Sequence, residues 1–394
     1  MSLILTRSPY FVSREDLDND ATLKLEIGYY DIDLGGLDIQ KTYNLAFRNS
    51  FFIDISPLLR DYISNDYKYS SFSGSYISTI SDKIATVRTT LSGSKSGVAQ
   101  SDVVDSHFIT DGYLYSSDEF NEDFSIKLQE RSYYAGSTDL IYKLDDSNVS
   151  LSFLATTVDI FASNSPENIN ITYKNKGEVL FTNTVNFDYD YTNFSYRKNS
   201  SNNLKSYKER IELQNAVLEE SICLSNFLDE FILEDYDEIL ISSNYGVHRI
   251  KVKTVEVCKH KPYRVTFVNR YGVEEDLWFF NRSDVSTTIN KETFRGNALP
   301  RYSAGDGVKT ISHFNVNGNE KITLNSGFVE EEMNEAFRQL LLSEEVTLYD
   351  YKENKRYNVN LGTSEFQYKQ HINEKLINYT IEFEFAHEVI NNVG

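Results

Sequence analysis

Residues 256–282 read EVCKHKPYRVTFVNRYGVEEDLWFFNR. After the break at Lys261-Pro262, a strand is expected from Tyr263 to Asn269, and an aromatic strand follows through Leu277 to Phe280. Tyr271-Gly272 lies between these two strands and marks a turn, because glycine is the residue that chain reversals most often use. The stretch therefore predicts a β-hairpin.

Alternation of apolar and polar residues predicts further strands on both sides of this hairpin. Ala21 to Ile27 (ATLKLEI) places three apolar residues on one face, Lys41 to Phe47 (KTYNLAF) repeats the pattern, and Leu376 to Phe385 (LINYTIEFEF) predicts one long strand. Residues Lys174 to Gly177 predict a hairpin turn. The 28 Tyr and 25 Phe against 2 Met also favour pleated, half-buried surfaces. We expect a mainly β protein of two to three β-sandwich-like domains.

The expected helices are few. One amphipathic helix is predicted near 327–342, with Glu330, Glu331 and Glu332 in its first turn, where carboxylates are favoured. A short helix is predicted over 57–63, with Ser56 as its N-cap and Pro57 at its first position, and another over 225–233. The apolar stripe of the 327–342 helix consists of Val329, Met333, Ala336, Phe337, Leu340 and Leu341.

A chain of 394 residues is long enough for two or three domains. We expect an N-terminal β domain with polar loops over 1–148, a central β domain over 149–289 and a C-terminal α+β domain over 290–394. No run of 18 apolar residues occurs, so we expect no membrane span.

The net charge of the chain indicates which kinds of partner it can bind. With 39 basic and 59 acidic residues the net charge is −20. Such a surface repels nucleic acid on average, so we expect no strong direct nucleic-acid binding.

The sequence contains no motif that is typical of a catalytic or metal-binding site. The sequence has no phosphate-binding glycine loop, no HExxH, no GxSxG and no paired CxxC, so we expect no catalytic residue, no cofactor and no metal. Cys258 and His260 share a strand face, which packing explains as well as metal ligation. The carboxylate run over 229–238 is interpreted as a solvated face. An irregular calcium site and a carboxylate pair of the glycosidase kind stay open, because neither has a local signature.

The hairpin of residues 256–282 resembles a pattern in structural proteins of tailed phages, including crAss-like and marine phages of Bacteroidetes. In that pattern Asn-(Lys/Arg)-aromatic-Gly forms the tip and an aromatic strand follows. The helix near 327–342 and the closing strand near 376–385 resemble the same family, so that the likeness covers roughly 240–394, and Ile53 to Ser56 agree more loosely. The motif residues, which the resemblance implies are packing residues, are Tyr263, Asn269, Gly272, Trp278, Phe280, Tyr379 and Phe383.

The resemblance implies a virion component of the tail, neck ring or baseplate, assembled in the host cytoplasm. Its partners would be other virion structural proteins and copies of itself in a ring, and it would not be an enzyme. The alternative is a receptor- or carbohydrate-binding module of the virion, since Tyr, Asn and Asp are abundant. A third reading, a glycan depolymerase, needs a carboxylate pair that a sequence does not reveal.

Overall fold

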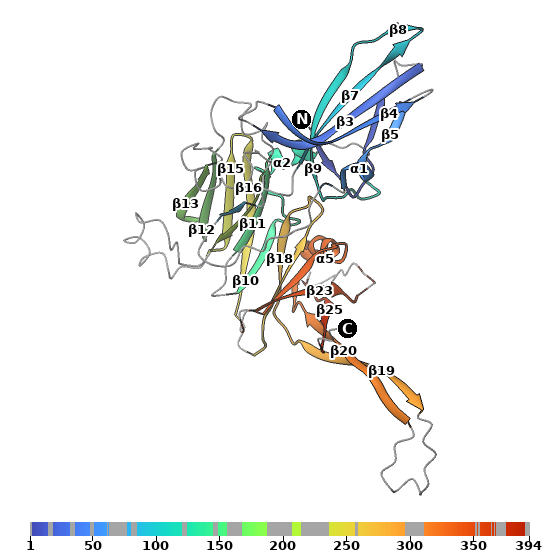
Figure 1. The fold of residues 1–394 in the computed structure, drawn as a ribbon. Coiled ribbons are helices and arrows are strands. Elements are labelled where there is room, and N and C mark those ends of the chain that lie inside the picture. Colours follow the sequence, from blue (N-terminus) through green and yellow to red (C-terminus); the bar gives the residue numbers. More distant parts are fainter. Residues whose placement is uncertain are drawn as a thin grey trace, which may run out of the picture. The chain divides into compact units, whose positions relative to one another are not determined.

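The computed structural model describes most of the chain (Figure 1). The described residues are 2–14, 19–31, 36–47, 51–60, 62, 77–79, 85–119, 124–144, 149–155, 168–186, 207–213, 236–256, 259–295, 311–350, 353, 355–363, 365, 367 and 376–390. Within them the protein is mainly β, with several sheets and few short helices, so the predicted fold class is confirmed. The helix expected over 225–233 lies outside these residues. No helix in these ranges is long and apolar enough to span a membrane.

The chain forms two compact units. The first consists of Met1–Glu256 together with Val268–Glu275, and the second of Val257–Phe267 together with Asp276–Gly394. This division differs from the three domains expected from the sequence. Strands β10 (Leu140–Leu144) and β16 (Gly246–Val255) pair in one sheet across the expected boundary at 148/149, and the boundary at 289/290 falls inside β19 (Asp284–Arg295). Strand pairing between distant segments, which composition does not reveal, joins the chain across both positions.

The first unit contains a twisted antiparallel sheet with one parallel edge strand. Its core is formed by Leu23, Leu25 and Val87 of the sheet and by Leu59 of a short helix, all almost fully buried. The order is β1 (Ser2–Leu5), β9 (Val103–Thr110), β7 (Ala85–Lys95), β3 (Asn19–Asp31) and β4 (Gly36–Phe47), with β8 (Val98–Ala99) paired to β7; β2 (Phe11–Arg14) pairs with β5 (Phe51–Asp54).

The short helix differs from its prediction in its bounds and its cap. Helix α1 covers Ser56–Arg60, whereas 57–63 was expected. The Asp54 carboxylate accepts hydrogen bonds from both the backbone N–H and the hydroxyl of Ser56. Ser56, the predicted cap, is thus the first residue of the helix, and its backbone N–H, which has no partner within the helix, is bound by Asp54.

Two further sheets of the first unit pack face to face. Leu151 and Phe153 of one sheet join Ile171, Ile241 and Ile250 of the other in a single buried cluster, which gives a sandwich-like core. The larger sheet has the order β10 (Leu140–Leu144), β16 (Gly246–Val255), β15 (Glu238–Ser243), β12 (Asn168–Asn175) and β13 (Glu178–Asn186); the smaller has β11 (Val149–Ala155), β14 (Tyr207–Leu213) and β6 (Ile77–Thr79). Helix α2 (Phe124–Glu130) also belongs to this unit.

The turn expected between two of these strands is confirmed. Strands β12 and β13 pair antiparallel up to Asn175 and Glu178. Lys176 and Gly177 have φ of 49° and 87°. Two successive positive φ values characterise the tight hairpin turn that suits the twist of the strands.

The second unit is built on one sheet that carries a helix. Phe279 of the sheet packs edge-on against Phe337 of the helix and against Phe383, with ring centroids 6.0 and 5.9 Å apart. The sheet order is β18 (Glu274–Phe279), β17 (Tyr263–Val268), β22 (Val346–Asp350), β23 (Lys355–Leu361), β25 (Thr380–Glu388), β20 (Ile311–Asn325) and β19 (Asp284–Arg295); the helix is α5 (Asn334–Leu341).

The helix is shorter than expected at its start. Val329–Glu330 form strand β21, which pairs with β24 (Leu376–Ile377), and Glu331–Met333 form a 3-10 turn before α5. Val329 is therefore buried as part of a strand and does not belong to the apolar stripe of the helix. Backbone pairing with a segment about fifty residues away overrides the local helical period.

The long strand expected over 376–385 is also divided. Strands β24 and β25 belong to different sheets and are separated by Asn378 and Tyr379. The Tyr379 N–H donates to the Ser326 hydroxyl at 2.9 Å, and Asn378 and Asn325 exchange side-chain hydrogen bonds. These local bonds redirect the chain between the two strands.

Candidate functional site

The seven motif residues are all buried, in two separate groups. Asn269 and Gly272 belong to the first unit, as part of the hairpin tip Val268–Glu275. The other five belong to the core of the second unit. Trp278 and Phe280 stack with ring centroids 6.4 Å apart, and the Tyr379 hydroxyl donates to the Asn334 side chain. The buried members of the second group are Tyr263, Trp278, Phe280, Tyr379 and Phe383.

Asn269 organises the hairpin tip from within. Its Oδ1 accepts the backbone N–H of Tyr271 at 3.0 Å, and its backbone carbonyl accepts the N–H of Gly272 at 2.9 Å. Gly272 has φ of +74°, and a Cβ there would lie 2.8 Å from the backbone carbonyl carbon of Asp111. Only glycine combines this conformation with so close a neighbour.

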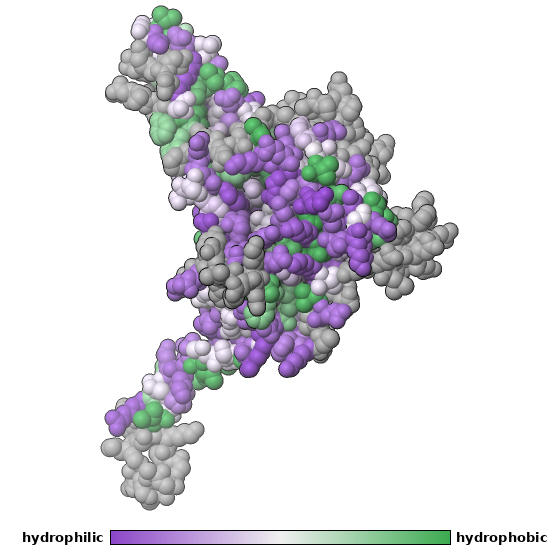
Figure 2. Space-filling view, turned by 180° about the vertical axis from the view of Figure 1, so that it is seen from behind, coloured by the Kyte–Doolittle hydropathy of each residue, from purple (hydrophilic) through white to green (hydrophobic). Residues whose placement is uncertain are grey.

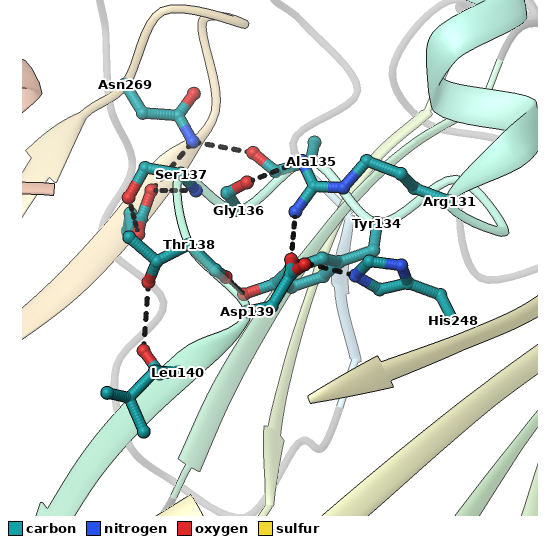
Figure 3. Close-up of polar contacts among 11 residues, drawn as sticks. Arg131, Tyr134, Ala135, Gly136, Ser137, Thr138, Asp139, Leu140, His248 and Asn269 are labelled. Atoms are coloured by element: carbon teal, nitrogen blue, oxygen red, sulfur yellow. Dashed lines mark hydrogen bonds and ion pairs between the residues drawn. The ribbon is translucent and has the colours of Figure 1, made fainter. Parts of the chain in front are cut away.

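A carboxylate of the same tip is held by a distant loop (Figure 3). Glu275 accepts hydrogen bonds from the backbone N–H of Ser137 at 2.9 Å, from the Ser137 hydroxyl, and from Asn269 Nδ2 at 2.9 Å. Asn269 Nδ2 also donates to the carbonyl of Ala135 at 2.7 Å. Burial raises the pKa of Glu275 above its usual value, although these hydrogen bonds oppose the rise.

The same loop carries an ion cluster (Figure 3). Asp139 Oδ1 lies 2.7 Å from Arg131 Nη2 and 3.0 Å from His248 Nε2. Burial opposes ionisation of Asp139, but the His248 hydrogen bond and the Arg131 charge outweigh it and lower the pKa to about 2. The His248 ring also stacks on Tyr134 with centroids 5.4 Å apart.

Two residues with strained backbone conformations lie just before the Asp139 side chain in the same loop. Ser132 and Tyr133 are both buried and have φ of 51° and 65°, a region that residues other than glycine rarely occupy. Each costs on the order of 1 kcal/mol. The Ser132 hydroxyl donates to the carbonyl of Gly246 at 3.0 Å, and the Tyr133 N–H bonds back to Leu128 of helix α2. Burial and these bonds hold the turn in place.

The contacts of this polar cluster hold distant segments of the chain together. The carboxylate of Asp139 is bound by Arg131 and His248, and the Ser137 hydroxyl is bound to Glu275. The imidazole of His248 is thus bound to Asp139 and stacked on the ring of Tyr134. The described ranges contain no group of three or more His, Cys, Asp or Glu side chains that could hold a metal ion. His260 is described, whereas Cys258 lies outside the described residues.

Sequence reasoning did not single out this cluster. Asp139 and His248 are 109 residues apart, and Ser137 and Glu275 are 138 apart. No spacing rule joins such positions. The one signal available was Asn269 itself, a polar residue in the motif, which the structure buries completely.

A second candidate surface is the two-stranded ribbon of β19 and β20. Every residue of β19 is exposed. Strand β20 pairs with β25 only from Asn319 onward, so its residues 311–317 have β19 as their one partner strand in the described part of the chain. The outer edge of β19 forms the end of the sheet. In Figures 1 and 2 the ribbon extends beyond the sheet of the second unit.

The ribbon exposes apolar side chains on both faces. The pairing register places Val285 and Ile289 on one face, and Phe294 and Phe314 on the other. Ile289 is 65% exposed, and the two phenylalanines contact each other edge-on at 6.1 Å while remaining about half exposed. Figure 2 shows hydrophobic residues among hydrophilic ones along the ribbon. Exposed apolar residues grouped in this way mark interaction sites.

Taken together, the fold and these two sites define a β-rich protein with a braced hairpin tip and an exposed β-ribbon. Neither the comparison with protein-family models nor the comparison with curated proteins gives a match to the chain.

Proposed function

We propose that this protein is a structural component of a tailed-phage virion, an oligomeric tail, neck-ring or baseplate protein that acts through protein–protein assembly. It binds other virion structural proteins and performs no reaction. The proposal combines two kinds of support, one from the ribbon and one from the sequence resemblance.

The β19–β20 ribbon is the observation that carries the assembly part. Five of its apolar side chains are 40 to 65% exposed in the chain by itself: Val285, Ile289, Phe294, Phe314 and Val316. Full burial of one such side chain contributes about 1.5–3 kcal/mol. A partner that covers several of them offsets the entropy lost on association.

The phage part of the proposal is supported by the resemblance of residues 256–282, 327–342 and 376–385. The motif consists of packing residues, and in this chain all seven are buried. A shared packing motif favours a shared fold and a shared structural role, but it implies no reaction.

Quantitative mass spectrometry of purified particles tests this function. The particles are those of the phage whose genome encodes the chain. We expect the chain in the particles at a fixed copy number relative to the major capsid protein, and retained after density-gradient purification. A chain found in the lysate and lost from purified particles would refute the proposal.

A further inference from the structure

We infer that the first unit contains a binding site for the hairpin tip Val268–Glu275, and that this site retains the second unit non-covalently when the chain is cut between the units. Three features of the structure support such a site: the path of the chain, the burial of the tip and the contacts that recognise it. The site is independent of the proposed virion function.

The chain passes between the two units three times. Residues 1–256 and 268–275 belong to the first unit, so the crossings follow Glu256, Phe267 and Glu275. The last two crossings flank the tip, and strands β17 and β18 extend from it into the sheet of the second unit. A cut near the first crossing therefore leaves the tip bound to the preceding residues by non-covalent contacts alone.

The tip contributes apolar side chains to a core of the first unit. Tyr271 and Val273 are only 9% and 2% exposed. The Tyr271 ring contacts the ring of Phe124 edge-on, with centroids 5.9 Å apart. Removal of the tip would expose this apolar surface to water, which is unfavourable. The other buried members of the cluster all precede the first crossing: Leu3, Leu5, Phe108, Phe124, Leu128, Ala135 and Leu154.

Polar groups of the first unit recognise the backbone of the tip. The hydroxyl of the fully buried Thr110 donates to the Tyr271 carbonyl at 2.8 Å. The Tyr113 N–H donates to the Arg270 carbonyl, also at 2.8 Å. Peptide-binding sites commonly gain affinity from such main-chain hydrogen bonds and specificity from the side chains that they enclose. The tip is thus bound in the manner of a peptide ligand.

Charged side chains of the tip are bound as well. Arg270 Nη2 lies 2.7 Å from Asp118 Oδ2, and the two side chains are 13% and 17% exposed. The Arg270 guanidinium also lies 4.5 Å from the centroid of the Tyr115 ring. At the other end of the tip, Glu275 accepts the backbone N–H of Ser137 at 2.9 Å. Charge-assisted hydrogen bonds of this kind are among the stronger ones in proteins.

Cleavage of the folded, full-length chain tests this binding site. A protease recognition sequence is inserted after Lys259, which is exposed and lies outside the strands. Proteolysis then produces fragments 1–259 and 260–394 from a protein that has already folded. The first fragment is immobilised through an N-terminal tag, and the rate at which the second fragment is released is measured.

We expect the two fragments to remain one complex without denaturant and to separate in urea. Arg270→Gln removes the ion pair with Asp118 and should speed release at least about tenfold, because a partly buried carboxylate loses its charged partner. Asn269→Ala should act in the same direction. The matched control is Arg282→Ala, which removes an ion pair with Asp284 outside the tip. Both side chains of that pair are more than 60% exposed, so the release rate should not change.

Fragments that separate as soon as the wild-type chain is cut would overturn the inference. So would a complex that Arg270→Gln and Asn269→Ala release no faster than Arg282→Ala, because contacts other than the tip would then hold it together. Circular dichroism before cleavage verifies the fold, and two tip variants are used so that the test does not depend on the folding of either one. The proposed virion function is judged separately by the particle measurement, whatever the release rates.

Discussion

Asn269 and Glu275 lie at the two ends of one hairpin tip, and the Asn269 Nδ2 donates a hydrogen bond to Glu275 Oε2 at 2.9 Å. The same amide nitrogen donates to the Ala135 carbonyl at 2.7 Å. A completely buried side chain thus joins the tip to the 131–139 loop within the first unit. The tip is accordingly a braced element, and its variants should report on the stability of this unit.

Replacement of Asn269 by alanine removes both donated hydrogen bonds and leaves the Glu275 carboxylate and the Ala135 carbonyl with one partner fewer. Loss of a buried hydrogen-bond partner costs about 1–3 kcal/mol, more for a charged group. We expect Asn269→Ala to destabilise the first unit by about 3 kcal/mol. The exposed Asn44 provides the control, and Asn44→Ala should change stability by less than about 0.5 kcal/mol.

Urea unfolding followed by peptide-resolved hydrogen exchange measures this effect in the first unit alone. Equal midpoints for Asn269→Ala and Asn44→Ala would show that the tip is not braced by this side chain.

Two glycines with the same backbone conformation separate strain from close contact. Gly272 has φ of +74° and Gly97 has φ of +79°. A Cβ at Gly97 meets nothing within 4 Å, whereas a Cβ at Gly272 would lie 2.8 Å from the Asp111 backbone. Gly97→Ala should cost about 1 kcal/mol for the positive φ alone. Gly272→Ala should cost clearly more, because the backbone of residue 111 must also move.

Thermal unfolding monitored by calorimetry measures both glycine variants. Similar shifts in transition temperature for the two variants would contradict the close approach of the tip to Asp111.

The pKa of Glu275 predicts a loss of stability with rising pH. Burial raises this pKa in the folded protein above the model-compound value of 4.5. The folded state therefore binds the proton more tightly than the unfolded state, so this residue lowers stability as the pH rises from 4.5 through the folded pKa. In Glu275→Gln the group does not ionise, and its amide can still contact Ser137.

The difference in unfolding free energy between the wild-type chain and Glu275→Gln should therefore change between pH 4 and pH 8 in favour of the variant. A difference that is constant over this range would rule out a raised pKa at this position.

Asp139 predicts the opposite pH dependence. Its folded pKa is lowered from 3.8 to about 2, despite burial, chiefly by the His248 hydrogen bond and the Arg131 charge. Its contribution is complete above pH 4 and is lost as the pH falls toward 2. Because the Asp139 side chain is 54% exposed, solvent screening limits the contribution to about 1 kcal/mol.

Asp139→Asn should remove this acid-side loss. The control Asp284→Asn disrupts the exposed pair with Arg282, in which both side chains are more than 60% exposed, and should have almost no effect. Acid titration of stability, monitored by tyrosine fluorescence, distinguishes them. If both variants titrated like the wild type, Asp139 would not be held by this ion cluster.

The strands were predictable where one face is buried. In β3 the apolar residues Leu23, Leu25 and Ile27 alternate with polar ones and are 0 to 1% exposed. This alternation can be recognised within a single short segment of the sequence. The turn at Lys176-Gly177 was predictable for the same reason, because its signal is local.

What the sequence did not predict depends on distant contacts. The start of α5 was placed too early because Val329–Glu330 pair with Leu376–Ile377. The Asp139–His248 and Ser137–Glu275 contacts join residues more than a hundred positions apart, and side-chain hydrogen bonds leave no periodic pattern. The exposed ribbon was missed because an alternating strand looks the same whether its faces are covered by its own chain or by another.

Hydrogen exchange along β19 tests the central claim, that the ribbon is an assembly element, most directly. The amides of Asp284–Arg295 are compared between the dilute, monomeric chain and purified particles. We predict that the β19 amides exchange at least tenfold more slowly in the particles, because a partner covers the edge that is open in the free chain. Equal exchange rates in the two states would contradict the account.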